Sequence, residues 1–153
     1  MWGSDWKFRF NRGRGRPGSL DMARYVLLRH ECPQSFKPSH WDLMLEADGV
    51  LATWELAALP AVWAEKLKVA QHALESPILA TRLTDHRLAY LDYEGLVSGN
   101  RGTVVRIASG SFEQEKFNKE AVVANLQGDQ LQGRIKLTRV AKSDRWELAL
   151  DQP

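Results

Sequence analysis

The sequence has one cysteine, no long apolar run and almost no net charge, and each of these shortages narrows the class of protein. Cys32 is the only cysteine among 153 residues, so no disulfide forms within the chain, which is typical of a reducing cytoplasm. No apolar stretch approaches the roughly 18–20 residues that cross a bilayer, so we expect no contact with a membrane. Residues 1–7 lack an apolar stretch behind a basic head, and no secretory signal is expected. These features together favour a cytoplasmic protein.

The composition is that of a folded domain. The chain is 44% hydrophobic and 26% charged, which excludes a disordered or fibrous protein. A length of 153 residues fits one domain with a sizeable core. Because no repeat or second domain is visible, we predict a monomer built from one domain over residues 22–153, preceded by an arm over residues 1–21.

The arm carries most of the charge asymmetry. Residues 1–21 contain five basic and two acidic side chains, and the other 132 residues are close to neutral. The glycine- and arginine-rich run over 12–19 has too few apolar residues to pack a core, so we predict disorder there. We expect Arg12, Arg14 and Arg16 to bind nucleic-acid phosphates. Three alternatives remain open: a solvated leader, a short edge strand over 6–10, or a true start at Met22.

The rest of the chain is typical of an all-β fold. Short stretches rich in β-formers lie between turn residues, and they cover residues 25–30, 40–46, 50–56, 78–85, 103–107, 121–126, 131–137 and 145–150. This pattern predicts a compact closed or partly open barrel of about eight strands, with a sandwich as the alternative. One segment differs, because Trp63, Leu67, Ala70 and Leu74 recur at helical spacing before Pro77. We therefore predict one peripheral helix over about 61–75.

The first group of reactive residues lies on the second predicted strand. His40 and Asp42 are two residues apart, so they point to the same face of the strand. His30 ends the preceding strand, and an antiparallel pair brings it beside them. A histidine and a carboxylate suit a divalent metal, although an exposed hydrogen-bonded pair explains the same tripeptide. Cys32 has the parity of His30, as either a thiolate ligand or a small apolar residue.

The second group follows the fourth predicted strand. Strand alternation gives Arg82 and His86 a common face, and Tyr90 comes four residues later. A histidine, an arginine and a tyrosine can hold a phosphate and donate a proton. A histidine at a strand end is also common for structural reasons alone.

These motifs, taken in series, resemble the 3′-phosphoesterase domain family of bacterial DNA ligase D, in a stand-alone form. His30 is followed by His-Trp-Asp-Leu-Met-Leu-Glu over 40–46 and by Asp-Gly-Val-Leu-Ala-Thr-Trp over 48–54. Asp-His-Arg-Leu-Ala-Tyr over 85–90, Gly-Thr-Val over 102–104 and a closing hairpin from Leu131 complete the resemblance. It covers residues 24–150, in the family's order and near its spacing.

The resemblance implies a β-barrel that uses a divalent metal, typically Mn²⁺, in DNA repair. Such a domain removes a 3′-terminal ribonucleoside and then the 3′-phosphate from nucleic-acid ends, and a DNA ligase or polymerase acts with it. By position, the metal ligands would be His30, His40 and Asp42. His86 and Tyr90 would contact the scissile phosphate.

Two departures bear on catalysis. The family has an arginine where this sequence has Met44, and a proline where it has Arg87. We expect Arg82, or else Arg87, to supply the missing positive charge, because a guanidinium holds two phosphate oxygens at once. The alternatives are a degenerate module that binds nucleic-acid ends or a repair partner without hydrolysis, and a generic barrel with scattered histidines.

Overall fold

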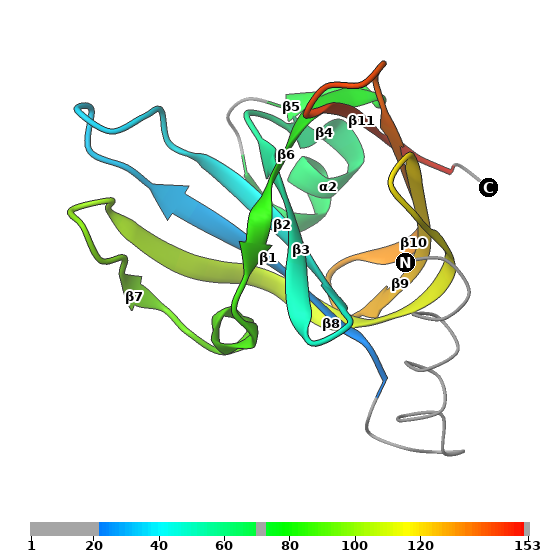
Figure 1. The fold of residues 1–153 in the computed structure, drawn as a ribbon, viewed down its shortest axis with the longest axis horizontal. Coiled ribbons are helices and arrows are strands. Elements are labelled where there is room, and N and C mark those ends of the chain that lie inside the picture. Colours follow the sequence, from blue (N-terminus) through cyan, green and yellow to red (C-terminus); the bar gives the residue numbers. More distant parts are fainter. Residues whose placement is uncertain (1–21, 70–72, 152–153) are drawn as a thin grey trace.

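The structure is a closed antiparallel β-barrel. A computed structural model describes residues 22–69 and 73–151, so the predicted arm lies outside the described residues. The barrel strands are β1 (Arg24–Glu31), β2 (His40–Ala47), β3 (Val50–Leu56), β6 (Ile78–His86), β8 (Thr103–Phe117), β9 (Ala121–Gly128), β10 (Gln132–Arg139) and β11 (Arg145–Leu150). They follow the order β1-β2-β3-β6-β11-β10-β9-β8, and β8 pairs with β1 to close the barrel (Figure 1). The predicted all-β barrel is confirmed.

Alternation along each strand fills the interior. On β1, Tyr25 and Leu27 point inward, and on β2 the inward residues are Trp41, Leu43 and Leu45. These side chains join the interior residues of the other strands in one large buried cluster. Burial of this apolar surface is the main driving force for the fold.

The outer face of β1 and β2 is also buried, which is unusual for a barrel strand. It carries a second set of packed side chains, here called the outer cluster: Val26, Leu28, Met44, Leu51, Leu91, Val97 and Val104. The covering segment runs from η2 (Leu88–Leu91) through β7 (Gly95–Leu96), which pairs with the start of β8. Every residue of β2 is therefore buried. This covered outer face is where His30, His40 and Asp42 lie.

Strand β8 is much longer than the predicted strand over 103–107. The strand continues past Gly110 to Phe117. A Cβ atom at Gly110 would lie 2.6 Å from the Gln127 carbonyl oxygen and 3.0 Å from the Tyr25 ring. The glycine therefore permits a close approach within the barrel wall.

The predicted helix is present but shorter than expected. Helix α2 (Ala61–Leu67) follows β4 (Leu59–Pro60) and packs Trp63 into the interior cluster. It ends because Lys68 adopts a left-handed conformation, with φ 59° and ψ 43°. Leu74 lies instead in β5 (Ala73–Leu74), which pairs with β4 and leaves Leu74 exposed. No described helix is long and apolar enough to span a membrane.

Candidate functional site

A pocket opens between the outer face of the barrel and the covering segment. Its volume is about 540 Å³. The lining residues are His30, Phe36, Lys37, His40, Asp42, Met44, Arg82, Leu83, Thr84, Asp85, His86, Arg87, Tyr90, Val97, Arg101 and Val104. The structure thus brings together, around one pocket, every predicted site residue outside the arm.

Strand pairing places the two histidines side by side. His30 of β1 is the direct partner of His40 of β2, and their ring centroids are 4.8 Å apart. Asp42, two residues along β2, lies on the same face. Its carboxylate oxygens are 3.3 Å from His40 Nε2 and 3.5 Å from His30 Nδ1. Each of these three residues is at least nine-tenths buried.

Two backbone carbonyls fix which nitrogens face the carboxylate. His40 Nδ1 lies 2.9 Å from the Pro38 carbonyl oxygen, and His30 Nε2 lies 2.7 Å from that of Arg101. A carbonyl oxygen only accepts, so both of these ring nitrogens donate. In the neutral rings, the other nitrogens are acceptors, and both turn toward Asp42. Two acceptor nitrogens and one carboxylate therefore face one another.

This arrangement requires positive charge between the three groups, as protons or as a cation. Burial alone would raise the pKa of Asp42, but the interactions of its carboxylate with the His30 and His40 rings outweigh burial and lower the pKa to about 2. Burial lowers the pKa of His40, yet its contacts with Asp42 leave that pKa above the ordinary value. Within the described residues, Asp42 Oδ1 is also a buried oxygen without a hydrogen-bond partner. An imidazole–imidazole–carboxylate set with an orphaned oxygen fits a divalent metal.

The sequence reasoning missed Glu55, which faces the same site. It pairs with Asp42 across β2 and β3, and its Oε1 lies 3.8 Å from His40 Nε2. His40, Asp42 and Glu55 form a group whose potential ligand atoms lie within 4.8 Å of one another. The sequence contained a signal for Glu55: a two-residue turn at Asp48 and Gly49 fixes the register of β2 and β3, and this register places Glu55 opposite Asp42. Glu55 also forms an ion pair of 2.7 Å with Lys37.

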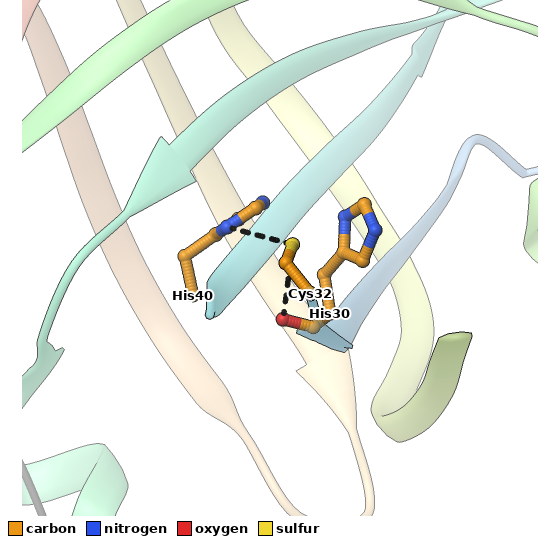
Figure 2. Close-up of side chains that lie close together, drawn as sticks. All are labelled: His30, Cys32 and His40. Atoms are coloured by element: carbon orange, nitrogen blue, oxygen red, sulfur yellow. Dashed lines mark hydrogen bonds between the residues drawn. The ribbon is translucent and has the colours of Figure 1, made fainter. Parts of the chain in front are cut away.

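Cys32 lies on the other side of His40. Its sulfur is 3.9 Å from His40 Nδ1, the nitrogen opposite the one that faces Asp42 (Figure 2). His30, Cys32 and His40 form a second group whose potential ligand atoms lie within 4.8 Å of one another. The two groups share His40.

His86 and Tyr90 lie together in the pocket lining. Their ring centroids are 5.6 Å apart in an edge-to-face contact. His86 Nδ1 lies 2.9 Å from the Thr84 carbonyl oxygen and donates to it, which leaves Nε2 available. Both side chains are partly exposed.

The prediction that Arg82 and His86 share a strand face is wrong. Arg82 pairs with Trp54 and Leu83 with Thr53, but His86 pairs with Leu51, so β6 carries one extra residue as a bulge. A bulge reverses the alternation of side chains beyond it. Arg82 therefore lies on the same sheet face as Trp54, the face that points into the barrel.

The Arg82 side chain lines the pocket but is engaged by neighbours. Its guanidinium carbon lies 4.9 Å from the Trp54 ring centroid, and its nitrogens donate to the Leu83 carbonyl at 2.6 Å and to Asp85 at 3.0 Å. Arg87 is exposed at the rim. Lys37 and Arg101, which the sequence reasoning did not select, add two more cationic side chains to the lining. Arg12, Arg14 and Arg16 lie outside the described residues.

Sequence comparison with known proteins identifies relatives of this chain. A sequence model of the DNA Ligase D 3′-phosphoesterase domain matches residues 29–139. The chain is 31% identical over 138 residues to the multifunctional non-homologous end joining DNA repair protein LigD of Mycobacterium tuberculosis, which covers 86% of this chain. It is 27% identical over 144 residues to the multifunctional non-homologous end joining protein LigD of Pseudomonas aeruginosa, which covers 87% of this chain. The chain spans 16% of the length of each of these relatives.

Proposed function

The chain belongs to the DNA ligase D 3′-phosphoesterase domain family of end-joining repair, and from this premise we propose that it is a metal-dependent hydrolase of blocked nucleic-acid 3′ ends. Its substrates would be ends that carry a 3′-ribonucleoside or a 3′-phosphate. The observation that carries the proposal is the convergence of His30, His40 and Asp42 beside a pocket lined by four cationic side chains.

The residues that would hold the metal are His30, His40 and Asp42, with Glu55 within reach of the same position. Nitrogen and carboxylate oxygen donors suit Mn²⁺, which we take as the cofactor. When bound, the metal would polarise the phosphoryl oxygens and lower the pKa of an attacking water. The carbonyls of Pro38 and Arg101 hold the two rings so that their acceptor nitrogens face the carboxylate.

The other pocket residues would bind the phosphate and handle protons. With Nδ1–H held by the Thr84 carbonyl, His86 would have to be in its protonated form for Nε2 to donate a proton to the leaving oxygen, and the Tyr90 hydroxyl would hydrogen-bond a phosphoryl oxygen. Arg87 would supply the positive charge that Met44 lacks, because it is exposed at the rim. Arg82 would act in the same role only by releasing Asp85.

The arm and the cellular setting complete the proposal. Arg12, Arg14 and Arg16 would add salt-sensitive, sequence-independent affinity for the phosphate backbone. The domain would act in the cytoplasm as a monomer, on ends that a DNA ligase or polymerase then uses.

One observation favours the alternative of an end-binding module without hydrolysis. Met44 is fully buried in the outer cluster and replaces an arginine that would bind phosphate directly. Under this alternative the pocket binds ends but does not cleave them.

A single experiment separates the two functions. A duplex with a 3′-phosphate or a 3′-ribonucleotide is incubated with the protein, with and without Mn²⁺. Manganese-dependent release of phosphate or nucleoside, lost in His40→Ala, supports the hydrolase. Binding of the duplex without release, unchanged by manganese, supports the end-binding module.

A further inference from the structure

His40 presents its two ring nitrogens to two different sets of donors. Nε2 faces the oxygens of Asp42 and Glu55 at 3.3 and 3.8 Å. Nδ1 faces the sulfur of Cys32 at 3.9 Å (Figure 2). One imidazole therefore separates an oxygen-rich set from a sulfur-containing set.

We infer that His30, Cys32 and His40 form a second, softer metal site of the zinc class, which competes with the oxygen-rich site for His40. Thiolate and imidazole are the ligands that Zn²⁺ prefers in proteins, whereas Mn²⁺ prefers carboxylate oxygen. The three ligand atoms already lie within 4.8 Å of one another.

One of the three ligand separations is already close to that of a zinc site. In a tetrahedral site with ordinary zinc bond lengths, sulfur and nitrogen ligands are about 3.6 Å apart. The observed separation of Cys32 Sγ and His40 Nδ1 is 3.9 Å. The backbone N–H of Cys32 donates to Ser39 Oγ at 2.9 Å, which ties the backbone of Cys32 to the residue that precedes His40. Cys32 is partly exposed, so a cation reaches it from solvent.

The two sites exclude each other through the ring proton of His40. Nδ1 donates to the Pro38 carbonyl in the structure, and this tautomer leaves Nε2 free for the oxygen-rich set. A metal bound at Nδ1 breaks that hydrogen bond and leaves the proton of a neutral ring on Nε2. His30 is shared as well, because it also contacts Asp42. Zinc at the softer site thus removes ligands from the manganese site.

Cobalt reports the softer site without any need for activity. Co²⁺ alone is added to the wild type, to Cys32→Ser and to Asp42→Asn, and the near-ultraviolet thiolate-to-cobalt charge-transfer absorption is recorded. We expect this absorption in the wild type and in Asp42→Asn, and its loss in Cys32→Ser. Absence of the band in the wild type, or its persistence in Cys32→Ser, would overturn the inference.

Zinc competition tests the regulatory consequence, which rests on the proposed function. With saturating Mn²⁺, added Zn²⁺ should inhibit hydrolysis by the wild type, and Cys32→Ser should raise the inhibitory zinc concentration by at least about tenfold. Equal inhibition of both proteins would refute the competition. If manganese supports no hydrolysis at all, the proposed function fails, while the cobalt spectrum still decides the softer site.

Discussion

His30 and His40 are direct cross-strand partners, and each donates one ring N–H to a backbone carbonyl while its other nitrogen faces the same carboxylate. Neither ring can rotate by half a turn without losing its carbonyl. Backbone geometry therefore fixes the position at which the pair would hold a cation.

The first prediction concerns the carboxylate. Asp42→Asn replaces one anionic oxygen by an amide N–H, which would point a donor at the metal position. We expect Mn²⁺ affinity to fall by at least about 100-fold and hydrolysis to be lost with it. Isothermal titration with Mn²⁺ measures the change. Asp48→Asn is the matched control, because Asp48 lies in the β2–β3 turn with φ 53°, a conformation that asparagine tolerates. Unchanged manganese affinity in Asp42→Asn would remove this residue from the metal site.

The second prediction is a reversal of pH dependence by metal. The folded-state pKa of His40 is raised above its unfolded value of 6.5, because contacts with Asp42 outweigh the effect of burial. In the metal-free protein, the resulting stabilisation is complete below pH 6.5 and is lost as pH rises through the folded-state pKa. Manganese competes with this proton, so stabilisation by Mn²⁺ should grow over the same range.

Thermal unfolding at several pH values, with and without Mn²⁺, measures both slopes. His40→Gln should flatten both, because it removes the titrating group. A metal-free wild type whose unfolding temperature rises with pH across this window would contradict the assignment.

The third prediction concerns Gly102, at the start of β8. Its φ is +94°, and a Cβ atom there would lie 1.8 Å from the Glu31 carbonyl oxygen. Gly102→Ala must therefore push the chain away from the end of β1, and with it the Arg101 carbonyl that holds His30. We expect a loss of more than about 3 kcal/mol of unfolding free energy and weaker manganese binding.

Gly133→Ala is the control for the glycine prediction. Gly133 has a similar φ of +112°, but a Cβ atom added there would meet nothing within 4 Å, so only backbone strain of about 1–3 kcal/mol should appear. Manganese affinity should remain that of the wild type. If Gly102→Ala and Gly133→Ala change manganese affinity equally, the contact of residue 102 with β1 does not contribute to metal binding.

The fourth prediction separates the two arginines. Arg87→Ala should lower kcat/KM for a 3′-phosphate end by about 10- to 100-fold. The unfolding temperature should not change, because the Arg87 side chain is exposed and forms no hydrogen bond or ion pair within residues 22–69 and 73–151. Arg82→Ala should lower the unfolding temperature, because it removes the contacts with Trp54 and Asp85. Lys136→Ala, an exposed charge on β10, is the control for net charge. Activity lost only in Arg82→Ala, with normal stability, would return the phosphate role to Arg82.

The sequence predicted the strands well because their patterns are local. All eight barrel strands were located, since alternation and turn residues are properties of short segments. The position of His30 beside His40 was also predicted, because a hairpin-like return to an antiparallel partner restricts the register.

What the sequence did not reveal depends on departures from regular structure. The bulge in β6 moves Arg82 away from the face of His86, and nothing in the residues between them marks the extra position. Strand β8 was predicted too short, and the close approach of Tyr25 that Gly110 permits within it depends on the closed barrel. The covering of the outer face likewise depends on contacts between η2 and strands far away in the chain.

Burial of β2 on both faces has a consequence for how the protein would acquire the proposed metal. A strand packed between two apolar layers has no low-energy local opening, so its amides should exchange hydrogen only through global unfolding. His40 and Asp42 are carried by this strand, and they hold their positions before any cation arrives. Binding of the proposed metal would then require only the encounter of an ion with ligands already in place, and the association rate should not be limited by a folding step.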